Sequence, residues 1–312
     1  MRPRLLAAGD LVGRWRVGRL LGRGRFGEVY AGIEQASGTS VAIKVEQEPS
    51  QPGKRSRLRR EARVHTALEG APGWSQLHWH GAANGVRALV SDRLGPSLKA
   101  LHRAVGPLTA QELALVASEA LSRLETLHGR GWLHGDIKPD NMLLPLGVSA
   151  LDEERSPGTP LLHCIDFGLS LKLPPGSAAE GSGARRGTLG AVRYASITNQ
   201  LLQPLGPRDD LEALAFSLVY LHRGRLPWSD VAAPTQRERF ELIRQAKTRE
   251  DPDALFAGLP AAFAEFLRGC RELDAEARPD YASLRSLFAD LQRGGGGAGQ
   301  EAPRTVLSSG DG

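Results

Sequence analysis

One eight-residue string constrains the fold of this chain more than any other feature. Residues 134–141 read His-Gly-Asp-Ile-Lys-Pro-Asp-Asn, so that a carboxylate, Asp136, stands five residues before an amide, Asn141. A carboxylate next to an attacking hydroxyl can accept its proton, and an amide oxygen is a ligand that a hard cation accepts. Lys138 lies between the two, where an ammonium can neutralise charge on a transferred group. The string predicts a catalytic loop, held in a fixed geometry by the surrounding fold.

A glycine-rich segment lies near the start of the chain. Residues 22–29 read Gly-Arg-Gly-Arg-Phe-Gly-Glu-Val, with glycines at Gly22, Gly24 and Gly27. Alone this pattern is weak, because a glycine-rich turn would also produce it, and the dinucleotide-binding form requires a helix after it. Here β-rich sequence lies on both sides and the turn ends in Val29. That arrangement is typical of loops whose backbone N–H groups lie over phosphates.

A lysine and two acidic residues complete a phosphate- and metal-binding set. Lys44 ends the β-rich run Val-Ala-Ile-Lys, where its ammonium can hold phosphates and needs an acidic partner. Glu61, on the helix that follows, is the predicted partner; Glu46 and Glu48 are competitors, although their place just beyond Lys44 suits solvent better. Asp166 opens the string Asp-Phe-Gly, and a carboxylate there can hold Mg²⁺. Each motif is weak alone, but the set in this order is specific.

Hydrophobic periodicity predicts an α+β chain, with its strands first and most of its helices after them. We expect an antiparallel sheet of five strands at 15–21, 28–33, 40–45, 77–80 and 88–91, with one helix at 55–68. Further helices are expected at 109–128, 210–221, 240–247, 260–270 and 281–291, and the apolar helix 210–221 should be buried.

We divide the chain into an N-terminal extension at 1–13, one domain at 14–292 and a disordered glycine-rich tail at 293–312, which has no apolar periodicity. Within the domain, a sheet lobe spans 14–91, a hinge 92–95 and a helical lobe 96–292. Residues 174–187 are expected to be mobile, and 145–160 to form a surface loop.

The composition is that of a soluble globular protein, with 312 residues of which 41% are hydrophobic and 24% charged. Cys164 and Cys270 cannot form a disulfide framework, so we expect an intracellular protein, cytoplasmic and/or nuclear. We also expect a monomer. The longest apolar run, 213–221, is too short to span a membrane. The net charge of +5 suits acidic partners, and the basic run at 54–60 could be a nuclear-import or nucleic-acid patch. Because no aromatic residues interleave with these charges, a solvated basic face is favoured over nucleic-acid binding.

Several further strings resemble those of the casein kinase 1 superfamily of protein Ser/Thr kinases. They are Leu-Gly-Pro-Ser-Leu at 94–98, Arg-Tyr-Ala-Ser-Ile at 193–197, Arg-Asp-Asp-Leu-Glu-Ala-Leu at 208–214, Leu-Pro-Trp at 226–228 and Arg-Pro-Asp-Tyr at 278–281. His-Gly-Asp at 134–136 is similar to the vaccinia-related kinases of the same superfamily. The resemblance spans residues 14–291. It implies a two-lobed protein kinase fold, with a small antiparallel-sheet N-lobe carrying one helix and a larger, mainly helical C-lobe.

The same resemblance implies ATP and Mg²⁺ as cofactors, and transfer of the γ-phosphoryl group of ATP to Ser or Thr hydroxyls of protein substrates. Asp136 would be the catalytic base, and the other catalytic residues would be Lys138, Lys44 and Glu61. Asn141 and Asp166 would hold Mg²⁺. Asp210 would brace the backbone of the catalytic loop.

The resemblance also implies how the nucleotide lies. Its adenine would lie between Val29 and Ala42 above and Leu143 below, and would bond to the backbone at Asp92 and Leu94. The residues that cover the nucleotide would be Leu21, Gly22, Gly24 and Gly27. Ser91 would stand just before the hinge, where a small residue leaves the pocket behind the adenine open.

Two departures from the family pattern bear on activity. Gly135 stands where most kinases have an arginine that meets an activation-loop phosphate, so switching by such a phosphate is not expected. Ala191 aligns with a threonine that would hydrogen-bond the catalytic Asp and Lys, unless Thr188 substitutes for it. Ala191 keeps open a second interpretation, a catalytically impaired kinase-fold scaffold. His-Gly-Asp also occurs in kinases of small alcohols, although these usually lack a lysine at Lys138.

The choice of protein substrate is left open. Arg193 matches part of a basic pocket with which family members favour acidic or pre-phosphorylated substrates. The expected lysine near the following helix is replaced by Gln236, with Arg237 beside it.

Overall fold

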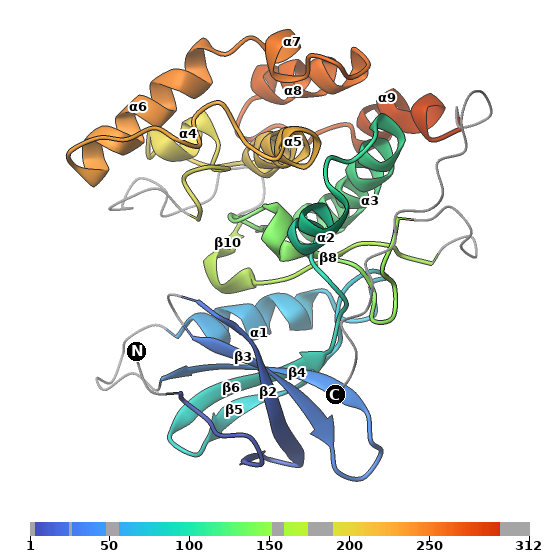
Figure 1. Cartoon of the computed structure of the whole chain (residues 1–312), viewed down its shortest axis with the longest axis vertical. Coiled ribbons are helices and arrows are strands. Elements are labelled where there is room, and N and C mark those ends of the chain that lie inside the picture. The colour runs from blue at the N-terminus through green and yellow to red at the C-terminus, as the bar shows by residue number, and fades with distance from the viewer. Residues whose placement is uncertain (1–3, 25–26, 48–55, 152–158, 174–189, 294–312) are drawn as a thin grey trace.

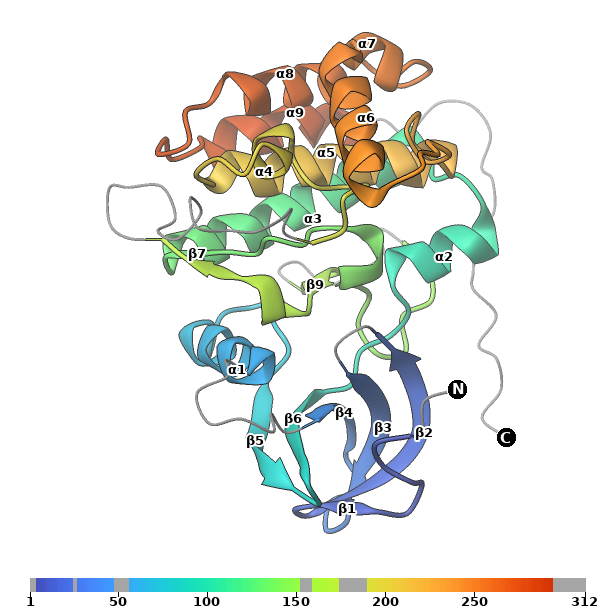
Figure 2. The same cartoon turned by 90° about the vertical axis from the view of Figure 1, so that its left-hand side faces the viewer.

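The structure is a computed structural model that describes residues 4–24, 27–47, 56–151, 159–173 and 190–293. A sheet with a single helix forms one lobe, and a larger, mainly helical lobe is joined to it (Figure 1). A view turned by 90° shows the same division, with the sheet at one end of the molecule (Figure 2). The α+β, two-lobed architecture expected from the sequence is present.

The sheet of the N-lobe is antiparallel and has six strands in the order β1-β2-β3-β4-β6-β5. Their bounds are β1 Leu11–Val12, β2 Trp15–Arg23, β3 Glu28–Glu34, β4 Ser40–Gln47, β5 Leu77–Ala83 and β6 Val86–Asp92. The sequence predicts five of these strands and misses β1, so the expected count was wrong. β1 has two residues, and two residues are too few to show an alternating pattern.

The pairing register separates two faces of this sheet, because successive side chains of a strand point to opposite sides. One face carries Tyr30, Ile43 and Val45, which are buried against Trp15 in a core of their own. The other face looks toward the C-lobe. Val29 pairs with Lys44, and Ala42 pairs with Ser91, so these four half-buried residues share that second face.

Helix α1 (Arg57–Ala67) covers part of this second face and packs against β5 and β6. Its Leu58 and Ala62 are buried against Leu89 of β6. The helix begins at Ser56, whose hydroxyl accepts the Arg59 N–H at 3.1 Å and donates to the carboxylate of Glu46. Glu46 is therefore engaged at the start of α1; the other competitor for Lys44, Glu48, lies outside the described residues.

The C-lobe is built from α2 (Leu98–Val105), α3 (Ala110–Gly129), α4 (Ile197–Gln200), α5 (Pro207–Arg223), α6 (Gln236–Arg249), α7 (Pro252–Leu255), α8 (Ala262–Glu272) and α9 (Tyr281–Arg293). Short elements carry the loops between them: β7 (Trp132–Leu133) pairs with β10 (Leu171–Lys172), β8 (Met142–Leu143) pairs with β9 (His163–Cys164), and η1 (Pro139–Asn141) and η2 (Phe167–Leu169) are single 3₁₀ turns. The sequence predicts α3, α5, α6, α8 and α9 and misses α2, α4 and α7, whose few turns show little periodicity.

Helix α5 forms the centre of the C-lobe. Nearly all its side chains are buried, including the acidic Asp209, Asp210 and Glu212 near its start. Phe216 packs edge-to-face on Trp228, with ring centroids 4.9 Å apart. Helix α3 begins at a capping box, in which Thr109 and Glu112 each accept a backbone N–H from the other's position. Within the described residues, no helix is both long and apolar enough to cross a membrane.

Three expectations concern segments that the structure does not describe. The mobile segment expected at 174–187, part of the surface loop expected at 145–160 (152–158), and the tail from 294 onward lie outside the described residues. Arg293, which the sequence assigns to the tail, is the last residue of α9.

The buried centre of α3 provides a test of the packing. Leu124 is 0% exposed, so Leu124→Ala removes buried contacts and leaves a cavity, and we expect the free energy of unfolding to fall by about 2–5 kcal/mol. Urea unfolding followed by tryptophan fluorescence measures this change. The matched control is Leu242→Ala on α6, where the leucine is 43% exposed and the change should stay within about 0.5 kcal/mol. Equal losses in both variants would contradict this packing.

Candidate active site

A three-residue ion cluster joins the two lobes. Lys44 on β4 places its Nζ 2.7 Å from Oε2 and 3.0 Å from Oε1 of Glu61, which lies on α1. The same Nζ lies 2.7 Å from Oδ1 of Asp166, in the C-lobe. The structure therefore brings together the lysine and carboxylate that the sequence pairs, and adds Asp166 to them.

Charge in this cluster is set by mutual proximity. Burial alone would lower the pKa of the Lys44 ammonium, but the Glu61 and Asp166 carboxylates together raise it above its usual value. Burial would raise the pKa of Asp166, yet Lys44 outweighs it and lowers the pKa of Asp166 to about 2. Both groups are therefore charged at neutral pH, as phosphate binding by Lys44 and cation binding by Asp166 would require.

The glycine-rich loop connects β2 and β3 in the same lobe as Lys44. The Gly24 N–H donates to the Gly27 carbonyl at 2.9 Å and closes the turn; Arg25 and Phe26 at its tip lie outside the described residues. A Cβ at Gly27 would come 2.1 Å from the Val45 carbonyl oxygen, so a side chain there would push β3 away from β4. Leu21, Gly22 and Gly24 are exposed, on the approach to this loop.

The residues expected around the adenine converge at the junction of the lobes. Val29, Ala42 and Ser91 lie on the sheet face that looks toward the C-lobe. Leu143 in β8 bridges to Ser97, just after the segment that connects β6 to α2. That segment is tied to β8 by two backbone hydrogen bonds, from the Gly95 N–H to Leu144 O (2.9 Å) and from the Leu144 N–H to Pro96 O (3.0 Å).

Asp92 and Leu94, expected at the hinge, flank the same junction. Asp92 ends β6, and its carboxylate is directed at β5, where it accepts the Gln76 N–H at 2.7 Å and lies 2.8 Å from His78 Nε2. The side chain thereby fixes the hinge to the sheet. The family resemblance assigns the backbone near Asp92 and the half-buried Leu94 to the adenine.

Three donors hold the carboxylate of Asp136. Lys138 Nζ lies 2.5 Å from Oδ2, and Asn141 Nδ2 lies 3.3 Å from the same oxygen. The backbone N–H of Ala191, from a distant part of the chain, donates to Oδ1 at 2.9 Å. The Asp136 side chain is only 7% exposed, so these bonds fix its orientation rather than compete with bulk water.

The loop that carries Asp136 is anchored by Asp210 at the start of α5. The Asp210 carboxylate accepts the His134 N–H at 2.7 Å and the Gly135 N–H at 2.9 Å, as the sequence predicts. It also lies 2.9 Å from Nε2 of His128 on α3. Burial would raise the pKa of Asp210, but these bonds lower it, so the anchor stays anionic.

Below the loop, His134 and Phe167 link the catalytic loop to α1. His134 is fully buried; its Nδ1 accepts the Asp136 N–H and its Nε2 donates to Ile165 O, and burial lowers its pKa, so the ring is neutral. Phe167, which follows Asp166, packs on His134 (5.4 Å between ring centroids) and edge-on to His65 of α1 (5.2 Å). The helix that carries Glu61 therefore rests on the residue next to Asp166.

Asn141 and Asp166 fit the ligand set of Mg²⁺. The side-chain amide nitrogen of Asn141 donates to the Asp136 carbonyl at 2.9 Å, which directs the amide oxygen to the other side. The backbone carbonyl of Asn141 accepts the Ile165 N–H at 3.0 Å, and this bond holds the two ligand-bearing segments together. The Asp166 side chain is 41% exposed and anionic. Among the described residues no group of three or more acidic, His or Cys side chains could hold a metal. A Mg²⁺ ion here would complete its shell with phosphate and water oxygens.

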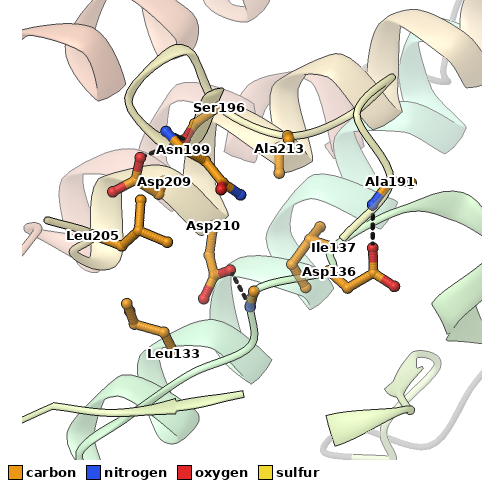
Figure 3. A pocket seen from close by; sticks show the side chains of 12 residues that line it. Leu133, Asp136, Ile137, Ala191, Ser196, Asn199, Leu205, Asp209, Asp210 and Ala213 are labelled. Atoms are coloured by element: carbon orange, nitrogen blue, oxygen red, sulfur yellow. Dashed lines mark hydrogen bonds between the residues drawn. The ribbon is translucent and has the colours of Figure 1, made fainter. Parts of the chain in front are cut away.

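A pocket lies between the catalytic loop and the segment that precedes α4, and Figure 3 shows how its lining residues lie. Asp136 and Ala191 face each other on one side of it, and Asp209 accepts a hydrogen bond from the buried Ser196 on the other. Gly190, just before Ala191, has a φ of 73°, and a Cβ there would lie 2.5 Å from Asp136 Oδ1. Only a glycine allows the chain to approach the catalytic carboxylate this closely.

The fold and this geometry are those of a two-lobed phosphotransferase, in which Lys44 would hold phosphates and Asp136 would be the catalytic carboxylate. The family model of the protein kinase domain matches residues 15–287. The chain therefore belongs to the protein kinase family.

Several groups in the site escaped prediction from sequence. The threonine expected in place of Ala191 would bond Asp136 through its side chain; instead the Ala191 backbone does so, and Thr188 lies outside the described residues. Glu212 of α5 pairs with Arg271 of α8 at 3.0 Å and accepts the Ile197 N–H at 3.0 Å, which fixes the segment after the pocket. Backbone donors leave no mark in a sequence. Glu212, by contrast, lies within residues 208–214, which resemble the kinase family, and could have been identified as an acidic residue on a largely apolar helix.

The close approach at Gly190 can be tested by adding one methyl group. Gly190→Ala forces the chain away from Asp136, and misplacement of about 1 Å can cost about 100-fold in rate. We therefore expect phosphoryl transfer to fall by about that factor while ATP affinity is kept. Initial rates with labelled ATP and a fluorescent nucleotide-binding assay measure the two quantities.

The control for strain is Gly38→Ala. Gly38 has a φ of 72°, close to that of Gly190, but no atom lies within 4 Å of its would-be Cβ. It carries the same left-handed strain without the clash, and its transfer rate should be near that of the unaltered protein. A Gly190→Ala variant as active as Gly38→Ala would show that the approach to Asp136 is not needed.

Proposed function

We propose that this chain is a protein serine/threonine kinase, similar to casein kinase 1, that transfers the γ-phosphoryl group of ATP to Ser or Thr hydroxyls of protein substrates with Mg²⁺. The observation that carries the proposal is that both halves of the site are assembled at once. Lys44 of the N-lobe bonds to Glu61 and Asp166 in one half of the site, while three donors hold Asp136 of the C-lobe in the other half. The narrower assignment to Ser/Thr and to casein kinase 1 rests on the strings at 193–197, 208–214 and 278–281.

In this mechanism Asp136 orients the substrate hydroxyl and accepts its proton as the oxygen attacks. Lys138, bonded to Asp136, balances negative charge on the group in flight, and Lys44 holds the α- and β-phosphates. ATP supplies the phosphoryl group, and Mg²⁺ on Asn141 and Asp166 would neutralise phosphate charge. The protein contributes chiefly positioning and charge stabilisation, for which fixed side chains are required.

The adenine fits between the sheet face and β8. Val29 and Ala42 supply its upper surface and Leu143 its lower one, with Asp92 and Leu94 at the connecting segment. The residues that close over the phosphates are Leu21, Gly22, Gly24 and Gly27. The alternation of exposure along β3 and β4 supports this placement, because the same face that carries Lys44 carries Val29 and Ala42.

The second candidate is a catalytically impaired scaffold of the kinase fold, which the alanine at Ala191 favours. The geometry weakens this reading, because the Ala191 N–H donates to Asp136 and so supplies one hydrogen bond from the segment that the threonine would occupy. A single neutral hydrogen bond contributes about 1 kcal/mol, so replacing one by another leaves most of the positioning intact.

The preferred protein substrates are acidic or already phosphorylated, in our proposal. Arg193 lies half-buried next to the pocket, and Gln236 and Arg237 are exposed in the first turn of α6. Arginine is suited to phosphate because its guanidinium presents parallel donors. Transfer to a small alcohol, the remaining alternative, is opposed by Lys138.

An assay with labelled ATP, Mg²⁺ and dephosphorylated casein tests the function directly. Asp136→Asn removes the proton acceptor while keeping the shape, so we expect label on casein to fall by about 100-fold or more, with ATP still bound. The control is Asp140→Asn in the same loop, whose carboxylate pairs with Lys99 at 2.7 Å on the outer side and should leave the rate within a few fold.

The outcomes separate the candidates. Label on casein that depends on Asp136 establishes the protein kinase. ATP binding without transfer to any acceptor would leave the scaffold, and Ala191→Thr would then be the substitution to restore activity. Transfer to a small alcohol, with none to casein, would replace the proposal by a small-molecule kinase.

The small side chain of Ser91 gives a second test, of the nucleotide pocket. Ser91 lies beside Ala42 on the sheet face that looks toward the C-lobe, so ATP analogues with a bulky N6 substituent should be accepted. We expect them to compete with ATP, with an inhibition constant within about tenfold of the ATP KM, that is, within about 1.4 kcal/mol. Ser91→Phe should exclude the analogues and still bind ATP. Analogues that fail to compete with the unaltered protein would show that the pocket is closed or lies elsewhere.

A further inference from the structure

A lysine outside the candidate active site lies buried beneath residues 191–195, the segment that contacts Asp136. Lys247, on α6, has 0% of its surface exposed. Its ammonium donates to the carbonyl oxygens of Val192 at 2.7 Å and Ala195 at 2.5 Å. Between these two residues, the Arg193 carbonyl accepts the indole N–H of Trp228 at 2.7 Å. Three carbonyls of residues 192–195 are thus held from the α6 side.

The surroundings of Lys247 are built for a cation. Its Nζ lies 5.1 Å from the centroid of Phe216 and 5.3 Å from that of Trp228, within range for cation–π attraction. Burial lowers the pKa of Lys247 to about 7, and the nearby Glu212 acts in the opposite direction. A buried ammonium is costly unless it is bonded, so the two carbonyls and two rings are what hold it there. The helix itself is fixed from behind, where Arg271 donates to the Lys247 carbonyl at 3.0 Å.

The other end of the same segment touches the catalytic carboxylate. The Ala191 N–H donates to Asp136, and the Tyr194 and Ala195 N–H groups donate back to Ala191 O at 2.9 and 3.0 Å. Residues 191–195 therefore form one compact turn, tied to Asp136 at its start and to Lys247 along its length. Any displacement of the carbonyls at Val192 or Ala195 moves the turn relative to Asp136.

We propose that Lys247 is a positioning residue for the protein substrate, which holds the 191–195 turn at the distance from Asp136 that a Ser or Thr hydroxyl requires. This inference rests on the proposed function, because it names the surface against which a protein substrate is aligned. Lys247 touches neither nucleotide nor acceptor and acts through the backbone. A lysine that served only to stabilise the fold would affect unfolding, but would not distinguish the protein substrate from ATP.

Kinetics of a Lys247→Met variant test this distinction. Methionine keeps the length and the apolar stem but cannot donate to the two carbonyls. We expect kcat/KM for casein to fall at least tenfold, with the KM for ATP unchanged within about twofold. The matched control is Ile243→Ala, one turn earlier on α6 and 1% exposed, which loosens the same helix but removes no hydrogen bond to the turn. Because isoleucine has no side-chain donor, this variant should lower the unfolding midpoint and leave kcat/KM for casein within a few fold, when assayed well below that midpoint.

Amide hydrogen exchange gives a readout that does not depend on activity. Lys247→Met should speed exchange in a peptide covering residues 190–196 by about tenfold, while peptides from α3 keep their protection. Ile243→Ala should leave the 190–196 peptide protected. If Lys247→Met does not fold, Lys247→Gln replaces it. Because glutamine can donate to one carbonyl, we expect a smaller fall in kcat/KM for casein and a smaller increase in the exchange rate of the 190–196 peptide.

The outcomes are distinct from those that test the kinase function. Unchanged exchange at 190–196, or equal losses of kcat/KM for casein in Lys247→Met and Ile243→Ala, overturns the role of Lys247. Absence of any transfer to casein by the unaltered protein overturns the proposed function instead, and the exchange measurement still decides whether Lys247 holds the turn.

Discussion

The loop that carries Asp136 depends on one buried carboxylate at the start of α5. Asp210 accepts the N–H groups of His134 and Gly135 from the start of α5, the most buried helix of the C-lobe. Two adjacent N–H groups aimed at one carboxylate leave the loop little freedom to rotate, and charge-assisted bonds of this kind are about twice as strong as neutral ones. Asp136 follows immediately, so α5 fixes the backbone from which its side chain projects, while Lys138, Asn141 and Ala191 orient the carboxylate. His128 extends the same anchor to α3, and the loop is thereby tied to the two longest helices of its lobe.

From this anchor the geometry passes to the other lobe through aromatic packing. His134 sits under Phe167, and Phe167 supports His65 on α1, the helix whose Glu61 bonds Lys44. Lys44 in turn bonds Asp166, the neighbour of Phe167, which closes a loop of contacts between the lobes. Because these contacts share residues, displacement of α1 would loosen both the ion pair and the packing on Phe167. The two halves of the site are therefore coupled, and the positions of Lys44 and Asp136 are not independent.

The sequence predicts those parts of this arrangement in which a side chain has a chemical task that few residue types can perform. Lys44, Glu61, Asp136, Asn141 and Asp166 could be named in advance for that reason, and the longer strands and helices followed from their periodicity. The sequence did not reveal β1 or the shortest helices, which have too few residues for a pattern. It also missed Gly190, one of 37 glycines, whose importance lies in its φ and in its distance from Asp136. Lys247 was missed because a lysine on a charged helix suggests solvent; only its spacing of four residues from Ile243 placed it on the buried face.

Ala191 shows why residue identity alone misjudges a site. Read from the sequence, alanine in place of threonine subtracts one hydrogen bond from Asp136 and favours an inactive scaffold. In the structure, the left-handed backbone of Gly190 turns the next peptide so that its N–H points at the same carboxylate. Every residue except proline carries that donor, so the bond survives the loss of the hydroxyl provided that the backbone is held in place. The requirement has moved from the side chain at 191 to the groups that fix the turn, which are the glycine before it and the carbonyl-binding lysine and tryptophan behind it. The bond to Asp136 therefore does not depend on the side chain at 191, but should be sensitive to change at those supports.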